Sequence, residues 1–575
     1  MEQKKNTLNF IKTNKQKVKI IDQAIEKKEY WKALRLLYSL MQENSDSVTA
    51  ELCYKLFSKL PYYVGFDDVC LKMLLSNNAE IVALGARSMI AHAKMYDIDD
   101  AKFYFNFAKN RLQNLLKNNN EISIEQILGW EIKENKFHFV DKQTIDIDAL
   151  RQIDAALNSG KLDDVIYESR KLNDPIARKM AAEALIIKKD YKGALAELKS
   201  MPEDQRDIYY NCLMARLFIL SKNSKELEKH IKAIESTELN SPEELIYLSE
   251  VFFVYKRPEV AIEIIEKNQQ KFEFYYPMYF TKGIAHFCLK QFNEAKECFK
   301  KTYILNNRQV AAKELVYILE NEKKIDFKLS IHSNFPPEII NRIEKKYKKQ
   351  IELKDNEFLK LSIGQMLDML YWVELFESEA MAEQYLLKMI CCKNGIEAIK
   401  RVLLSFQTTN WLKMQCIKML IFSGANDVDI WFTCKKRVKT IKLLLPKFML
   451  QESEVVGNMF YSEDINYNKF LHAYATAFSV LAFENEDFEE RLAEVGDCCI
   501  KSVIDEFDKQ KRNKILEKYV LAILLYATCS DNLPCEFSQK KAKNSRFSSY
   551  SLLASEFEIE TEELKKLAKI IFANV

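Results

Sequence analysis

The stretch from Tyr279 to Asn307 reads YFTKGIAHFCLKQFNEAKECFKKTYILNN, and it predicts a pair of packed helices. Gly283 stands in the first helical segment, and Ala295 stands in the second. Phe292, Ala295 and Phe299 follow one another at spacings of three and four residues, which places them on one helical face. Helices that cross closely need small residues at the crossing. Gly283 and Ala295 supply one each, so we expect Phe292 and Phe299 to wedge against a neighbouring helix pair.

The position of Ala295 recurs through the middle of the chain. Ala194, Leu227 and Ala261 precede it, and the four positions follow one another at intervals of 33, 34 and 34 residues. Leu227 is bulky where the other three residues are small. A missing backbone N–H is tolerated at the start of a helix. Prolines stand at the predicted starts of three first helices: Pro175, Pro242 and Pro277.

This pattern resembles the tetratricopeptide repeat, a helix-turn-helix unit of about 34 residues. The resemblance is clear over 175–307 and looser over 18–117 and 147–174. It implies a mainly α fold, in which an α-solenoid of helical hairpins is followed by a helical C-terminal region. Residues 429–446 alternate around a basic turn and predict a small β-hairpin within that region.

The expected organisation has five parts. They are N-terminal hairpins over 1–117, a connector over 118–146, a central array over 147–320, a connector with helices and the β-hairpin over 321–450, and a helical region over 451–575.

Composition narrows the class of protein. The 575 residues include only 11 Gly and 10 Pro, which favours long helices joined by short turns. Lys and Arg number 86 against 83 Asp and Glu, and this near balance argues against a broad nucleic-acid surface. Thirteen scattered cysteines fit a reducing compartment. No apolar run is long enough to span a bilayer, so we expect a cytoplasmic protein without membrane contact.

The resemblance implies that the first helix of each hairpin lines a concave groove. An apolar groove suits an amphipathic helix or an extended peptide, and aromatic and Arg side chains carry binding energy at interfaces. The alternative is that the protein's own C-terminal half, or the next turn of the superhelix, fills the groove. The predicted groove residues are Lys179, Glu183, Tyr209, Cys212, Arg216, Ile246, Glu250, Phe253, Phe280, Ile284 and Phe287.

Residues 548–571 offer a second hypothesis, a degenerate helix-turn-helix. In this reading the repeats sense a peptide or protein, and the tail contacts DNA or a transcription factor. Glu558 stands at the turn, where Gly is usual, and Glu562 and Glu563 would repel phosphates, so an ordinary helical hairpin is the better interpretation. The residues that could touch nucleic acid are Lys540, Lys541, Lys543, Arg546, Lys565, Lys566 and Lys569.

Catalytic and metal-binding patterns are missing from the sequence. It contains no Gly-rich phosphate loop, no nucleophile elbow and no HExxH motif, and its cysteine pairs lack zinc spacing. His286 falls at an interhelical packing position, and the basic turn at 435–442 is expected to be a solvated hairpin tip. We therefore expect a non-catalytic scaffold or adaptor that binds a protein or peptide without cofactor or metal. The oligomeric state stays open.

Overall fold

A computed structural model of the chain supplies the fold described below. It describes residues 17–43, 47–60, 65–94, 98–116, 124, 128, 150, 153, 156–157, 161–172, 174–235, 238–322, 325, 327–329, 337–423, 426–434, 437–447, 454–456, 459–461, 465–485, 487–509, 516–530, 541–543 and 546–572. Of the predicted connector at 118–146, only residues 124 and 128 are among them.

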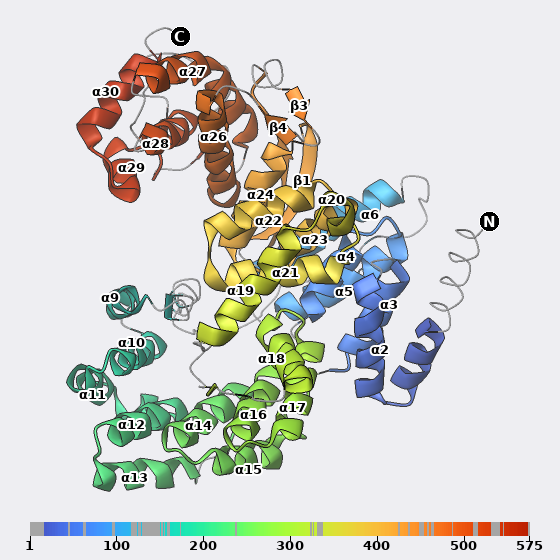
Figure 1. The fold of residues 1–575 in the computed structure, drawn as a ribbon, viewed down its shortest axis with the longest axis vertical. Coiled ribbons are helices and arrows are strands. Elements are labelled where there is room, and N and C mark those ends of the chain that lie inside the picture. Colours follow the sequence, from blue (N-terminus) through green and yellow to red (C-terminus); the bar gives the residue numbers. More distant parts are fainter. Residues whose placement is uncertain are drawn as a thin grey trace. The chain divides into compact units, whose positions relative to one another are not determined.

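The fold is mainly helical with a small antiparallel sheet, as the sequence predicts (Figure 1). The chain divides into two compact units. The inserted unit comprises residues 56–65 and 130–344, and the discontinuous unit comprises residues 1–55, 66–129 and 345–575. Because the inserted unit interrupts the discontinuous unit in sequence, the N-terminal helices belong with the C-terminal half and not with the central array.

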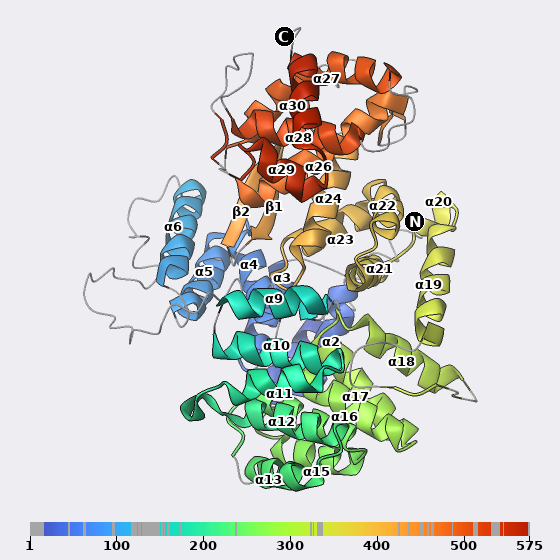
Figure 2. The ribbon, with the colours of Figure 1, turned by 90° about the vertical axis from the view of Figure 1, so that its left-hand side faces the viewer.

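The inserted unit is a succession of antiparallel helices, and α9 to α13 lie one after another in Figure 2. Four central hairpins, α10–α11, α12–α13, α14–α15 and α16–α17, form most of it. Its helices are α9 (Leu162–Leu172), α10 (Pro175–Ile187), α11 (Tyr191–Lys199), a short 3₁₀ turn (Glu203–Gln205), α12 (Ile208–Leu220), α13 (Ser224–Glu235), α14 (Pro242–Val254), α15 (Pro258–Asn268), α16 (Tyr276–Cys288), α17 (Phe292–Leu305) and α18 (Val310–Asn321).

Local sequence explains where these helices begin. Pro175 opens α10, and the Asp174 side chain accepts hydrogen bonds from two of the first backbone N–H groups. Pro242 opens α14, where Ser241 and Glu244 form a reciprocal capping box. Each first helix contacts the first helix of the next hairpin, so α10, α12, α14 and α16 form one layer.

The small residues predicted at the helix crossings are buried. Ala194, Ala261 and Ala295 are fully buried, and Leu227 is 8% exposed. At Gly283, a Cβ atom would approach the Phe299 ring to 2.6 Å. Phe299 therefore packs on Gly283 within its own hairpin, although it was expected to wedge against a neighbouring one.

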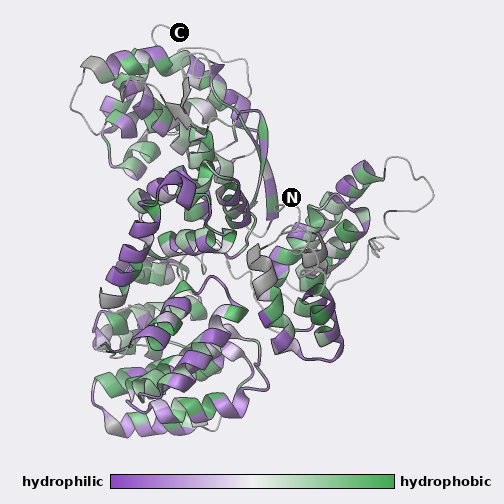
Figure 3. Ribbon diagram, turned by 45° about the vertical axis from the view of Figure 1, so that its right-hand side comes forward, coloured by the Kyte–Doolittle hydropathy of each residue, from purple (hydrophilic) through white to green (hydrophobic). Residues whose placement is uncertain are grey.

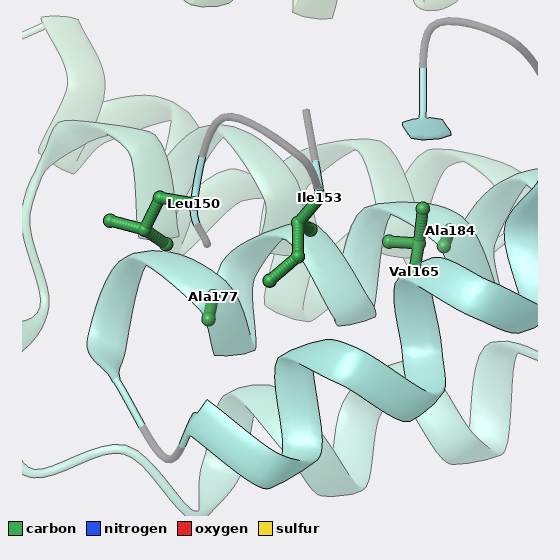
Figure 4. Close-up of a cluster of buried hydrophobic side chains, with 5 residues drawn as sticks. All are labelled: Leu150, Ile153, Val165, Ala177 and Ala184. Atoms are coloured by element: carbon green, nitrogen blue, oxygen red, sulfur yellow. The ribbon is translucent and has the colours of Figure 1, made fainter. Parts of the chain in front are cut away.

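The array begins before the first clear repeat. Val165 of α9 lies in a buried cluster with Ala177 and Ala184 of α10 (Figure 4). Leu150 and Ile153 belong to the same cluster. The looser part of the resemblance, 147–174, thus contributes packed core to the first hairpin.

The discontinuous unit has two helical parts and two short sheets. Hydrophilic and hydrophobic residues interleave along its helices (Figure 3). Its elements are α2 (Tyr30–Glu43), α3 (Ser47–Phe57), α4 (Phe66–Leu74), α5 (Ala79–Lys94), α6 (Ile98–Leu115), α19 (Pro337–Ile351), α20 (Asp355–Phe358), α21 (Ile363–Phe376), α22 (Glu379–Ile390), α23 (Lys393–Leu403), α24 (Asn410–Phe422), β1 (Val428–Cys434), β2 (Arg437–Leu443), β3 (Glu454–Val456), β4 (Met459–Tyr461), α26 (Ile465–Glu484), α27 (Glu489–Lys509), α28 (Leu516–Cys529), α29 (Tyr550–Phe557) and α30 (Thr561–Phe572). The unit borders fall inside α3 and α19.

Two polar contacts join the N-terminal and C-terminal parts of this unit. Asp68 of α4 accepts hydrogen bonds from the Ser405 hydroxyl at 2.6 Å and from the Phe406 backbone N–H at 2.9 Å. Asp100 of α6 forms an ion pair with Arg437 of β2 at 2.6 Å. Charged side chains that are nearly buried are paired in folded proteins, and Asp100 is only 8% exposed.

The predicted β-hairpin is confirmed. Strands β1 and β2 pair antiparallel, with Ile430 opposite Ile441 and Phe432 opposite Lys439. The C-terminal helices α29 and α30 contact α27 and α28, so the tail is packed onto the helices before it. Among the described residues, no helix combines the length and the apolar character needed to cross a bilayer.

Candidate functional site on the first helices of the central hairpins

Three equivalent positions of consecutive first helices form a ladder of charges. Arg216 of α12 donates from Nη1 to Glu183 Oε1 of α10 at 2.8 Å and to Glu250 Oε2 of α14 at 3.5 Å. The three residues are separated by 33 and 34 residues, the same intervals as the small crossing residues. The predicted register therefore places equivalent residues of neighbouring first helices in contact.

The ladder holds two carboxylates for one guanidinium. Arg216 is 2% exposed, and its burial lowers its pKa, but Glu183 and Glu250 outweigh that effect and raise the pKa overall. Burial raises the pKa of Glu250 to about 7, although Arg216 acts in the opposite direction. Glu250 therefore holds a proton more readily than an ordinary glutamate, because burial disfavours its charged form.

Tyr209 of α12 adds a hydrogen-bond donor to the ladder, at Glu183 of α10. Its hydroxyl donates to Glu183 Oε2 at 2.6 Å, and its ring stacks on Tyr247 with centroids 4.0 Å apart. Burial raises the pKa of Tyr209 well above its ordinary value, so the phenol remains a neutral donor. Lys179, 4% exposed, forms an ion pair with Asp207, which also caps the first turn of α12.

The chain itself covers the apolar end of the predicted groove. Phe287 of α16 is 5% exposed and stacks on Phe327, with ring centroids 5.3 Å apart. The Cys288 thiol donates to the Leu329 carbonyl oxygen at 3.8 Å. The segment directly after α18, which belongs to the inserted unit, thus lies against this end of α16.

The eleven predicted residues therefore fall into three groups. Lys179, Glu183, Tyr209, Arg216 and Glu250 are paired with one another or with Asp207 and Tyr247. Cys212, Ile284 and Phe287 are buried, and burial raises the pKa of the Cys212 thiol. The half-buried side chains are Ile246, Phe253 and Phe280.

Sequence reasoning missed three residues of this site. Tyr247 lies three residues before Glu250 on the same helical face, so helical spacing could have identified it. Asp207 precedes the apolar run of α12, which is the position of an N-cap. Phe327 lies in a connector without periodicity, and no pattern in the sequence points to it.

The basic residues of the tail are partly neutralised. Arg546 forms ion pairs with Glu556 and Glu484, and Lys565 pairs with Glu562 at 2.8 Å. Lys540 lies outside the described residues, whereas Lys541, Lys543, Lys566 and Lys569 are exposed. Glu563 accepts a hydrogen bond from the Tyr519 hydroxyl at 2.9 Å, which ties the start of α30 to α28.

Glu558 adopts the left-handed conformation with φ 54°, at the turn where a helix-turn-helix usually has Gly. This left-handed residue ends α29, and the first turn of α30 that follows is acidic, with Glu562 and Glu563.

The basic turn of the β-hairpin is not a wholly solvated tip. Arg437 pairs with Asp100 and lies 5.5 Å from the Phe103 ring centroid. Trp431 packs edge-on against Phe107, with centroids 5.7 Å apart. Lys435 and Lys436 lie outside the described residues. Arg437 of this turn is therefore paired with α6, although 42% of its side chain stays exposed.

Metal-ligand and histidine chemistry is limited in the part of the chain that the structure describes. No group of three or more His, Cys, Asp or Glu residues there lies close enough to hold a metal ion. His286 is 8% exposed and its Nδ1 lies 2.6 Å from the Gln291 side-chain oxygen, which satisfies it as a core residue. Cys298 is buried, and burial raises the pKa of its thiol to about 11.

No protein-family model matches the chain, and no curated protein matches it.

Proposed function

We propose that the central hairpins form a tetratricopeptide-type α-solenoid and that their first-helix layer binds a protein partner. The repeated register of the Glu183–Arg216–Glu250 ladder supports the solenoid assignment, because equivalent positions meet at every step that it spans. The partner would be an extended peptide or an amphipathic helix that lies across α14 and α16.

The observation that carries the proposal is a strip of half-buried apolar side chains beside the ladder. Ile246 and Phe253 on α14 and Phe280 on α16 keep part of their surface open, while Ile284 and Phe287 nearby are fully packed. Aromatic side chains that become buried on association supply most of the binding energy at protein interfaces. This strip is the anchor that a partner would cover.

The paired residues around the strip would hold the helices that carry it at a fixed spacing. Arg216, held by two carboxylates, fixes the spacing of α10, α12 and α14 before a partner arrives. A surface that is ordered in advance loses little conformational entropy on binding, so more of the contact energy appears as affinity. The proposed activity is non-catalytic, cytoplasmic and independent of any cofactor or metal.

Affinity capture tests this proposal. Tagged protein is expressed in its native host, and the captured proteins are quantified for the wild type, Phe253→Glu and Phe280→Glu. A carboxylate in the strip should lower recovery of the true partner at least tenfold, because the charge would be buried without a counter-ion. Tyr317→Glu is the matched control, since Tyr317 of α18 is 57% exposed and lies outside the strip.

Recovery that is equal in wild type and both strip variants contradicts the proposal. Far-ultraviolet circular dichroism of each variant must retain the helical signal, so that loss of partner is not loss of fold.

A further inference from the structure

The turn inside each central hairpin uses the same unusual backbone conformation and the same residue. Lys189, Lys222, Lys256 and Lys290 all have positive φ, at 66°, 57°, 59° and 61°. Each ends a first helix with the same pair of hydrogen bonds. At the first turn, Lys189 N–H donates to the Ile186 carbonyl and Asp190 N–H donates to the Leu185 carbonyl.

Lysine is a poor choice for this conformation. The Cβ atom of a non-glycine residue is crowded in the left-handed region, and Gly occupies it without that penalty. Gly is accordingly the usual residue after a helix that ends in this way. At four equivalent positions the chain carries Lys where Gly would be more stable, so the four side chains point to a purpose other than stability.

The four lysines are exposed and available for contact. None of them forms an ion pair with a residue that the structure describes. Nearby Lys188 and Arg257 are already paired, with Asp163 and Glu259 respectively. Lys192 and Lys225, which follow two of the turns, are exposed as well.

Apolar side chains stand beside these lysines. Large apolar residues with more than a third of their surface exposed occur at every turn, and they lie one or two residues before the lysine. They are Ile187 at 45%, Leu220 at 39%, Tyr255 at 43% and Leu289 at 36%. The turns therefore offer charge and apolar surface together. We call the four lysines and these four residues the turn edge.

The connectivity aligns the turn edge. Because each hairpin is antiparallel, α10, α12, α14 and α16 run in the same direction, and their neighbouring contacts make them adjacent. Their C-terminal ends therefore lie along one side of the array. Packed helices stand about 8–10 Å apart, so one lysine follows another at roughly that interval.

We propose that the turn edge binds an extended acidic segment of another protein. An extended polyproline II segment rises about 3.1 Å per residue with three residues per turn, so every third residue lies on the same face, advances about 9 Å and meets the next lysine. The segment would carry Asp or Glu at every third position over about 12 residues, with aliphatic residues between them. This site lies at the hairpin turns, so it does not depend on the proposed binding strip at Ile246, Phe253 and Phe280.

The aliphatic character of the turn edge favours an acidic protein segment over nucleic acid. Single-stranded nucleic acid is bound through aromatic platforms on which bases stack. Three of the four apolar residues of the turn edge are aliphatic, and only Tyr255 offers a ring. Aliphatic side chains instead suit the Leu, Ile or Val residues of a peptide.

Binding of a defined peptide tests the proposal. The probe is a labelled 15-residue peptide with Glu at every third position and Leu or Ser between, and its partner is the same peptide with Gln for Glu. Fluorescence anisotropy should show binding of the Glu peptide that weakens as salt rises, because exposed charges are screened. The Gln peptide should bind about tenfold more weakly.

A quadruple variant removes the charges without endangering the fold. In Lys189→Gly/Lys222→Gly/Lys256→Gly/Lys290→Gly the affinity for the Glu peptide should fall about tenfold, while thermal stability rises. The control removes four exposed lysines from second helices: Lys199→Gln/Lys229→Gln/Lys232→Gln/Lys267→Gln. This control should retain the affinity of the wild type.

Several results would overturn the proposal. They are absence of binding at low salt, equal affinity for the Glu and Gln peptides, and an equal loss in the turn-edge and control variants. Tighter binding of a 15-nucleotide single-stranded DNA, or of phosphatidylserine vesicles, would assign the turn edge to a phosphate-bearing partner and would equally refute an acidic protein segment.

Discussion

The central hairpins and the C-terminal region both contain residues with positive φ, and these residues are basic in the hairpins and acidic in the C-terminal region. In the central hairpins, every described residue other than Gly with positive φ is a lysine, as is Lys28 of the discontinuous unit. The four such residues after residue 345 are acidic: Glu377, Asp487 and Glu558 follow helices, and Asp427 precedes β1. The two regions nevertheless share one packing feature at some of these positions: the residue five places after the residue with positive φ is buried. Ala382 and Leu492 lie five residues after Glu377 and Asp487 and are fully buried, as Ala194 is five residues after Lys189. The two regions therefore share a local unit, and only the central hairpins repeat it at a constant interval.

A core deletion provides the strongest way to separate the two regions. Phe299 of α17 is fully buried against Gly283, and Phe299→Ala should lower the free energy of unfolding by about 3–5 kcal/mol. Hydrogen exchange should accelerate in 175–305 and remain unchanged in 465–529. Phe292→Ala, which truncates a half-buried ring of the same helix, should cost less than half as much. Equal acceleration in both ranges would mean that the regions unfold together.

The charge ladder joins three first helices of the central hairpins, and its removal should be costly. Arg216→Met leaves two nearly buried carboxylates without their guanidinium, so chemical denaturation should show a loss of about 3 kcal/mol. The triple variant Glu183→Gln/Arg216→Met/Glu250→Gln removes the charges together and should recover most of the loss. A triple variant as unstable as Arg216→Met would show that the guanidinium acts through packing alone.

Glu250 of the central hairpins and His472 of the C-terminal helices should make the free energy of unfolding depend on pH in opposite directions. The folded pKa of Glu250 is raised from 4.5 to about 7, so its contribution to stability is complete below pH 4.5 and is lost as pH rises through 7. Burial lowers the pKa of His472 of α26 from 6.5 to about 4, with Lys418 adding to the shift. Its contribution is complete above pH 6.5 and is lost as pH falls through 4.

Urea unfolding at pH 4, 6 and 8 measures both effects. Glu250→Gln should flatten the decline between pH 5 and 8 by up to about 3 kcal/mol, and His472→Gln should flatten the decline between pH 6.5 and 4 by a similar amount. A pH profile that neither variant changes would contradict the assigned pKa shifts.

The smallest expected effect concerns the turns themselves. Lys222→Gly and Glu377→Gly should each raise the free energy of unfolding by about 1 kcal/mol, because both residues have positive φ. Lys222→Val should lower it, since a β-branched residue is crowded further in this conformation. Differential scanning calorimetry resolves these shifts. Destabilisation by Gly at either site would show that the lysine or glutamate side chain contributes stability of its own.

The repeat interval of 33 to 34 residues allowed the central hairpins to be predicted from the sequence. Small residues at 194, 261 and 295 marked the helix crossings. Glu183 and Arg216 were predicted as groove residues, and their ion pair is known from the structure alone. The β-hairpin was also predictable, because alternation around a basic turn is a local pattern.

The rest of the architecture depends on long-range packing. An apolar helical face shows that a helix is buried but does not identify its neighbour, so the pairing of Asp68 with Ser405 left no trace in the sequence. The lysines of the turn edge were visible as residues, yet their left-handed conformation was not, since Lys is ordinary in helices and loops.

When one unit is inserted into the sequence of another, cleavage within the insertion can leave the interrupted unit folded. Residues 130–344 are such an insertion. The segments on either side of it are joined by the hydrogen bond of Ser405 to Asp68 and by the ion pair of Arg437 with Asp100. A protease that nicks the inserted unit would therefore leave a body built from two polypeptides. The same arrangement makes this protein a natural candidate for fragment complementation, in which separately produced N-terminal and C-terminal pieces find each other.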